Sequence, residues 1–136
     1  MQLLVNIDVD DLARATAFYC AAFALRTGRR FGTGGVELLG GTAPLYLLAK
    51  PAGSPAYPGA TQMRDYARHW TPVHFDIVVD DVDAAVGRAV AAGATLEQAA
   101  RSANWGRIAL LADPFGNGFC LLQFLGRGYD EIATPA

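Results

Sequence analysis

The sequence predicts an α+β protein built from two tandem β-α-β-β-β modules, and the main reason is an internal repeat. The segment Val-Asp-Asp-Leu at positions 9–12 recurs as Val-Asp-Asp-Val at positions 79–82, which is 70 residues later (79 − 9). Repetition at a fixed period indicates that one supersecondary unit occurs twice. The length of 136 residues, of which 52% are apolar, suits a single domain with a hydrophobic core.

Each copy of the repeat begins with an alternating apolar segment that predicts a half-buried strand. Positions 3, 5, 7 and 9 carry Leu, Val, Ile and Val, and positions 73, 75, 77 and 79 carry Val, Phe, Ile and Val. A period of two places such residues on one face of a strand. Further short apolar runs, bounded by turn residues, predict strands at 26–31, 36–39, 45–49, 95–99, 107–111 and 118–124.

A helix is expected directly after each first strand. Asp11 and Asp81 are well placed as N-caps, because a carboxylate there accepts hydrogen bonds from the first free N–H groups of a helix. Gly93 is a stop signal for the second helix, and the first is expected to end near residues 24–25. The apolar stripes predicted to face the sheets are Leu12, Thr16, Tyr19, Cys20 and Phe23, and Val82, Val86, Ala89, Val90 and Gly93.

One domain, 1–136, is therefore expected, with the first module at about 1–50 and the second at about 73–125. A connector at 51–72 joins them, and a short peripheral tail occupies 126–136. The connector contains Tyr57, Tyr66, His69 and Trp70, and such ring-rich composition argues against pure disorder. We expect it to pack partly over the domain, as long functional loops do.

Charge and composition exclude several classes of partner. Eleven basic and thirteen acidic residues leave a net charge of −2, with no basic stripe for nucleic acid. No window approaches the roughly 20 apolar residues of a membrane span, and the N-terminus lacks the pattern of a signal peptide. A cytoplasmic location is expected. Cys20 and Cys120 are the only cysteines and do not suggest a disulfide scaffold.

Three segments together resemble the glyoxalase, bleomycin-resistance and extradiol-dioxygenase superfamily, also called the vicinal oxygen chelate (VOC) superfamily. They are the run from Asp11-Leu12 to Phe18-Tyr19, the run from His74 to Ala94, and Asp-Pro-Phe-Gly-Asn-Gly-Phe-Cys at 113–120. The resemblance implies two modules whose mixed sheet curls around a cleft, with a small molecule bound inside. It also implies that a homodimer is plausible.

In metal-dependent VOC proteins the cleft holds a divalent ion, and the resemblance implies ligands at Leu4, Tyr46, His74 and Cys120 of this sequence. This set contains neither a carboxylate nor a second histidine, which hard and borderline ions such as Mg²⁺, Mn²⁺ and Fe²⁺ prefer. We therefore expect no metal cofactor. The alternative is one divalent metal held by His74, Asp76 and Cys120, since Asp76 lies on the same strand face as His74.

The leading hypothesis is consequently a protein that binds a small, aromatic or amphipathic molecule in the cleft between the modules without the usual metal. The predicted ligand contacts are Leu4, Asn6, Tyr46, His74, Asp76, Trp105 and Cys120. Each has a competing interpretation as ordinary packing or as a solvated strand residue. Cys120 is better explained as a buried structural cysteine than as a nucleophile, because no activating base is evident.

Two enzymatic alternatives stay open at this point. One is a metal-dependent lyase, isomerase or dioxygenase, in which the ion acts as a Lewis acid. The other is a cofactorless enzyme in which His74, the best catalytic candidate, works with Asp76 as an acid–base pair.

Overall fold

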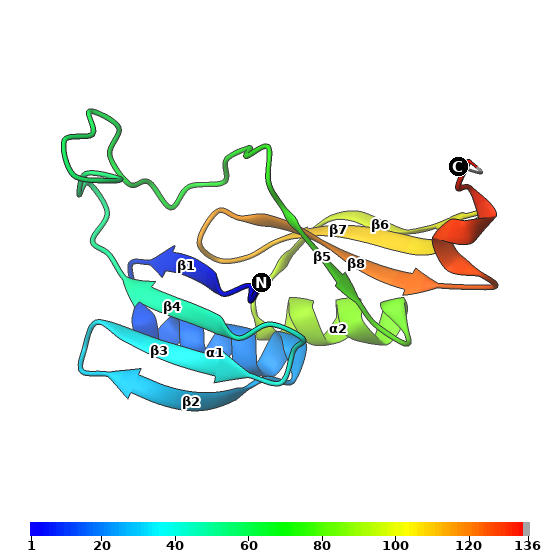
Figure 1. Cartoon of the computed structure of the whole chain (residues 1–136), viewed down its shortest axis with the longest axis horizontal. Helices are drawn as coiled ribbons and strands as arrows, with labels where there is room; N and C mark the ends of the chain where they lie inside the picture. The colour runs from blue at the N-terminus through cyan, green and yellow to red at the C-terminus, as the bar shows by residue number, and fades with distance from the viewer. Residues whose placement is uncertain (135–136) are drawn as a thin grey trace. The chain divides into compact units, whose positions relative to one another are not determined.

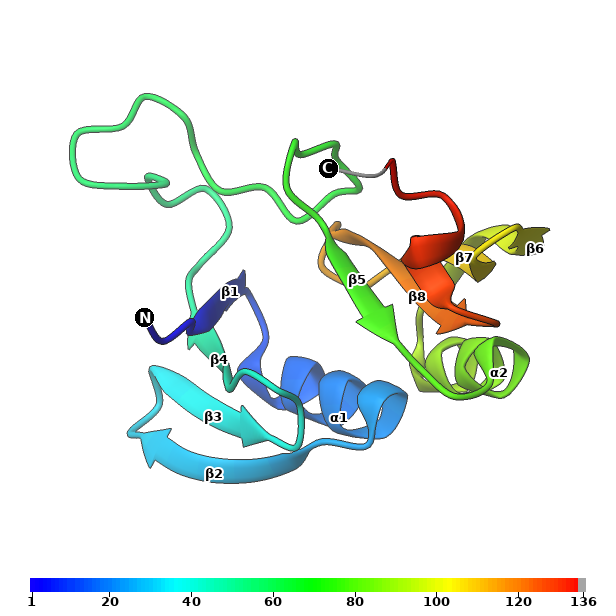
Figure 2. The ribbon, with the colours of Figure 1, turned by 45° about the vertical axis from the view of Figure 1, so that its right-hand side comes forward.

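A computed structural model describes residues 1–134 and divides the chain into two compact units, Met1–Ala67 and Arg68–Ala136. Each unit contains one four-stranded sheet and one α-helix (Figures 1 and 2). The division falls inside the predicted connector. The prediction of two tandem α+β modules is confirmed, and each unit is described by itself below.

The first unit forms the sheet order β1-β4-β3-β2. Strand β1 pairs with β4 in parallel, whereas β4 with β3 and β3 with β2 are antiparallel, so the sheet is mixed. The parallel pair requires a crossover, which the helix and two strands supply. The elements are β1 (Val5–Val9), α1 (Leu12–Phe23), β2 (Arg26–Phe31), β3 (Gly35–Leu39) and β4 (Leu45–Ala49).

The second unit repeats this topology in the order β5-β8-β7-β6, with β5 parallel to β8 and the other pairs antiparallel. The internal repeat in the sequence is thus a repeat of structure. Strand β6 continues beyond its predicted end at residue 99 to residue 103. The elements are β5 (Phe75–Val78), α2 (Val82–Ala92), β6 (Thr95–Ala103), β7 (Gly106–Ala112), β8 (Gly118–Phe124) and the 3₁₀ helix η1 (Gly128–Glu131).

The predicted helix boundaries are confirmed at atomic detail. The carboxylate of Asp11 accepts a hydrogen bond from the Arg14 N–H at 2.9 Å, and that of Asp81 accepts one from the Ala84 N–H at 3.0 Å. Helix α2 ends at Gly93 with φ 117°, a conformation that glycine adopts without steric cost. Helix α1 ends in the same left-handed region at Ala24, with φ 53°.

The predicted helix stripes are partly wrong. The buried residues of α1 are Ala15, Phe18, Tyr19 and Ala22, and in α2 Val90 is 44% exposed whereas Ala85 is buried. Small alanine side chains let a helix approach its sheet closely, so Ala15 and Ala85 lie on the line of contact, which in α1 also includes Phe18 and Tyr19. The true apolar face is therefore rotated by about one residue from the predicted one.

The core of each unit lies between the helix and one face of the sheet. Fully buried side chains there include Val9, Leu38 and Leu47 in the first unit and Leu111 and Leu121 in the second. Because side chains alternate along a strand, the residues between them point to the opposite sheet face. That opposite face carries the candidate site residues.

A hydrogen-bonded turn sets the start of β8. The buried carboxylate of Asp113 accepts hydrogen bonds from the Phe115 N–H at 2.8 Å and the Asn117 N–H at 2.9 Å. The Asn117 side-chain amide donates a third, at 2.8 Å. This is the Asp-Pro-Phe-Gly-Asn motif noted in the sequence, and it holds the strand that carries Cys120.

The part of the connector up to residue 67 is tied to the first unit. The Arg64 guanidinium forms an ion pair with Asp8 at 2.7 Å and donates to the carbonyl of Ala56 at 2.9 Å. The Tyr66 hydroxyl donates to the Lys50 carbonyl at 2.7 Å. These bonds support the expectation that the connector packs on the fold in this segment.

The predicted tail is partly ordered by aromatic packing. The Tyr129 ring lies 4.7 Å from that of Phe124 and 5.1 Å from that of Trp105, measured between centroids. The last two tail positions, 135–136, lie outside the described residues. Within residues 1–134, none of the helices has the length and apolar character that crossing a membrane requires.

Candidate functional site

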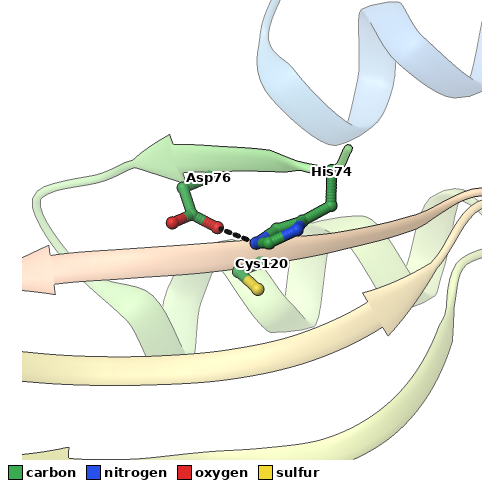
Figure 3. Close-up of side chains that lie close together, drawn as sticks. All are labelled: His74, Asp76 and Cys120. Atoms are coloured by element: carbon green, nitrogen blue, oxygen red, sulfur yellow. Dashed lines mark ion pairs between the residues drawn. The ribbon is translucent and has the colours of Figure 1, made fainter. Parts of the chain in front are cut away.

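Three predicted site residues come together on the open face of the second unit's sheet. His74 immediately precedes β5, Asp76 lies on β5, and Cys120 is its register partner on β8. The His74 Nε2 and Asp76 Oδ1 atoms are 3.3 Å apart, and one ligand atom from each of the three residues lies within 4.8 Å of the others (Figure 3). The pairing of β5 with β8 therefore creates a compact His-Asp-Cys cluster.

The three members of the cluster differ in exposure. Cys120 is 8% exposed, whereas the side chains of His74 and Asp76 are 56% and 40% exposed. Burial, the hydrogen bond to the Asp76 carboxylate and the negative charge of that carboxylate together raise the pKa of the Cys120 thiol to about 11. The free thiol is thus protonated at neutral pH, which supports a structural rather than a nucleophilic role for it.

A pocket of about 180 Å³ adjoins the cluster, and all its lining residues belong to the second unit. Trp70, Leu110 and Phe119 contribute apolar surface to it. His74 and Cys120 form part of its wall. An apolar hollow with a few polar groups at its edge is the usual form of a small-molecule site.

Arg68 and Glu97 form an ion pair at the edge of this pocket. The Arg68 Nε and Nη2 atoms donate to the two carboxylate oxygens at 2.5 and 3.0 Å, and this hydrogen bonding lowers the pKa of Glu97. Gly118 makes room for the guanidinium, since a Cβ there would lie 2.7 Å from Nη2. The pair was not predicted, because two isolated charged residues 29 positions apart give no signal in the sequence.

The first unit carries a different polar network at the corresponding place. Asn6, Tyr46 and Glu37 are register partners across β1, β4 and β3. The Tyr46 hydroxyl donates to Glu37 at 2.8 Å, and Arg29 Nη2 donates to Glu37 at 2.5 Å and to the Tyr46 oxygen at 2.9 Å. Hydrogen bonds from Arg29 lower the pKa of the Glu37 carboxyl to about 2, so it stays ionised.

The metal-ligand set implied by the VOC resemblance does not fit these residues. Leu4 offers no ligand atom, and the Tyr46 hydroxyl is already bonded to Glu37 and Arg29. Loss of Tyr46's proton is also disfavoured, because the hydrogen bond to Glu37 raises its pKa. The four-ligand hard-metal centre is consequently not formed by Leu4, Tyr46, His74 and Cys120.

Trp105 lies apart from the pocket lining. Its ring packs at 6.0 Å from that of Phe124 and against Tyr129, next to the 3₁₀ helix η1. The predicted contacts Asn6 and Tyr46 belong to the first unit, and Asn6 is exposed on β1. Of the seven predicted ligand contacts, the structure gathers His74, Asp76 and Cys120 into one cluster.

Replacing Asp76 with asparagine is expected to lower the pKa of the Cys120 thiol from about 11, because the variant loses the negative charge that disfavours the thiolate. A lower pKa means more thiolate at a given alkaline pH and hence faster alkylation. The rate with iodoacetamide, measured against pH with chelator present in a Cys20→Ser background, checks this. An unchanged profile would show that Asp76 does not influence the thiol.

Comparison with known proteins agrees with the repeat and the topology. The family model of the glyoxalase-like domain matches residues 4–122. An uncharacterized protein of Mycobacterium bovis is 36% identical over 122 residues, covering 87% of this chain and 80% of that protein. An uncharacterized protein of Mycobacterium tuberculosis is also 36% identical over 122 residues, covering 71% of that protein.

Solved structures share the fold at low sequence identity. A glyoxalase/bleomycin resistance protein/dioxygenase family enzyme from Burkholderia phytofirmans has a TM-score of 0.69 at 24% identity, covering 90% of this chain and 97% of that one. A fosfomycin resistance protein from Listeria monocytogenes has a TM-score of 0.68 at 18% identity, covering 92% and 93%. The chain therefore belongs to the glyoxalase-like domain family of the VOC superfamily.

Proposed function

We propose that this protein binds a small aromatic or amphipathic molecule in the pocket of its second unit, without the four-ligand hard-metal centre typical of its superfamily. The observation that carries the proposal is the pocket itself, an apolar hollow beside the His-Asp-Cys cluster. Leu4 offers no ligand atom and the Tyr46 hydroxyl already donates to Glu37, and both facts support the proposal that this metal centre is not used.

Trp70 and Phe119 supply the aromatic surface that a flat ligand needs. The Trp70 residue is 82% exposed although it lines the pocket, so its indole ring is available for stacking. An aromatic pair contributes about 0.5–1.5 kcal/mol beyond the area that it buries. Burying the exposed indole under a ligand would also remove apolar surface from water, which stabilises the complex by about 25 cal/mol for each Å² buried.

Polar groups on the wall would orient such a ligand. The His74 imidazole can donate or accept a hydrogen bond, and its Nε2 atom lies 3.3 Å from Asp76 Oδ1. The pocket is smaller than the several hundred Å³ usual for a site that encloses a drug-sized molecule. We therefore expect either a small ligand or a larger one that inserts a single ring.

Tryptophan fluorescence gives a direct test, because Trp70 and Trp105 are the only tryptophans. In a Trp105→Phe variant, Trp70 is the sole reporter, and planar aromatic compounds with a polar or anionic group are titrated in the presence of chelator. We expect saturable quenching by a subset of them. Trp70→Ala should weaken the binding of those compounds, measured by calorimetry, by about tenfold, which corresponds to about 1.4 kcal/mol.

The matched control is Trp105→Phe itself, which should bind as tightly as the unmodified chain because Trp105 packs on Phe124 and Tyr129. Equal affinity in Trp70→Ala would remove this pocket as the binding site. If no compound in the panel changes either the Trp70 fluorescence or the melting temperature, the proposal of an aromatic ligand fails.

A further inference from the structure

We infer that His74, Asp76 and Cys120 form a binding site for one thiophilic divalent cation of the Zn²⁺ class. The site lies within the second unit and is chemically different from the four-position set implied by the superfamily. It goes beyond the proposed small-molecule binding, because it requires no organic ligand. The inference rests on the convergence of three ligand atoms of different chemistry.

The geometry of the cluster is close to that of a zinc site. Zn–S bonds of about 2.3 Å and Zn–N and Zn–O bonds of about 2.0–2.2 Å place tetrahedral ligand atoms about 3.3–3.7 Å apart. His74 Nε2 and Asp76 Oδ1 already lie at 3.3 Å, and the whole set lies within 4.8 Å. A closure of about 1 Å therefore completes the arrangement.

The ligand atoms must approach one another by about 1 Å, and the side chains that have to move are those that have room to do so. The cysteine is held on β8 in the middle of a register-paired strand and is almost fully buried. His74 and Asp76 are both more than a third exposed, so rotation of their side chains meets little steric resistance. Figure 3 shows the His74 imidazole and the Asp76 carboxylate facing each other along one strand, with the Cys120 side chain beside them on the neighbouring strand.

The ligand types determine which cation is bound. A neutral imidazole, a carboxylate and a thiolate suit Zn²⁺, Co²⁺ and Cd²⁺, whereas Mg²⁺ and Ca²⁺ require oxygen ligands. Binding transfers the Cys120 proton to solvent, and the two negative ligands then balance the charge of the ion. Three protein ligands leave a fourth position for water or for an atom of a pocket ligand.

The inferred site also accounts for two residues that differ from the superfamily pattern. Cys120 stands where that pattern implies a carboxylate, and Asp76, two residues after His74, supplies the oxygen ligand instead. The exchange of a carboxylate for a thiolate changes the selectivity from hard to soft ions. Leu4 and Tyr46 are not needed in this arrangement.

The test uses the full chain, freed of metal by a chelator that is then removed, with the metal ions as the only probes. Co²⁺ titration followed by visible absorption and Zn²⁺ titration by competition with a chromophoric chelator should each give one equivalent per chain. Mg²⁺ should compete with neither. Cd²⁺ should produce an ultraviolet cadmium–thiolate absorption band, which reports the sulfur ligand directly.

Variants at the three ligands should lose this binding. We expect Cys120→Ser to abolish the cadmium–thiolate band and to weaken Zn²⁺ binding by about 100-fold, and His74→Ala and Asp76→Asn to weaken it by at least about tenfold. Asp76→Asn is the decisive variant where Cys120→Ser proves unstable, because the Asp76 side chain is 40% exposed and a replacement of nearly the same shape is expected to preserve the fold. Circular dichroism verifies folding in each case.

The chain supplies its own matched controls, since it has two cysteines and two histidines. Cys20→Ser and His69→Ala should retain full binding, because neither residue belongs to the cluster. The inference is overturned if Zn²⁺ binds to Cys120→Ser or Asp76→Asn as tightly as to the unmodified chain, if binding is lost in Cys20→Ser, or if the folded chain binds no Zn²⁺. The Trp70 titrations contain chelator, and the metal titrations contain no organic ligand. The proposal of an aromatic ligand and the proposal of a metal site can therefore fail independently of each other.

Discussion

Phe115→Ala is expected to lower the free energy of unfolding of the second unit by about 3–5 kcal/mol. Phe115 is fully buried and is the largest such side chain among the described residues. It also follows Asp113 in the turn that starts β8, so its removal leaves a cavity next to the strand that carries Cys120. The residues that line the cavity lose van der Waals contacts with the ring, and the surrounding structure relaxes too little to replace them.

Urea denaturation followed by circular dichroism measures this change, with the transition midpoint and slope compared between variants. Phe31→Ala is the matched control, because that residue is 48% exposed and should cost about 1 kcal/mol or less. A stability of Phe115→Ala within about 1 kcal/mol of the unmodified chain would show that the turn repacks around the lost ring.

Gly106→Ala is expected to destabilise the second unit by about 3 kcal/mol or more. Gly106 has φ 152°, which strains any L side chain, and a Cβ there would overlap the Gln123 carbonyl oxygen. That oxygen belongs to the backbone of β8, whose neighbouring residue Phe124 is the register partner of Gly106. To relieve this overlap, β7 and β8 would have to separate near Gly106.

Gly87→Ala provides the opposite control within the same unit. Gly87 lies inside α2, and a Cβ there meets nothing within 4 Å. The substitution should therefore stabilise the helix by about 0.5–1 kcal/mol. Thermal denaturation of both variants compares them directly. If Gly106→Ala melts at the temperature of the unmodified chain, the close approach of Gly106 to β8 has no energetic importance.

Local signals were enough to predict most of the fold. The helix caps at Asp11 and Asp81, the stop at Gly93 and the alternation along the strands act between near neighbours, so they can be read without knowing the tertiary structure. The helix faces were predicted less well, because the contact line depends on how closely Ala15 and Ala85 allow each helix to approach its sheet.

Long-range ion pairs were not predictable in the same way. Arg29 with Glu37 and Arg68 with Glu97 carry no motif, and their pairing depends on which strands become neighbours. Likewise, the sequence predicted Trp105 as a ligand contact, but its ring packs on that of Tyr129. Tyr129 belongs to the segment 126–136, for which only a peripheral tail was predicted.

Local patterns in the sequence were sufficient to predict the two modules, to support the family resemblance and to single out His74, Asp76 and Cys120 as candidate residues. The meeting of these three residues depends on the fold, because Asp76 and Cys120 are 44 residues apart (120 − 76) and become neighbours through the pairing of β5 with β8. Periodicity reports which face a residue occupies, whereas register between distant strands decides which residues share a site.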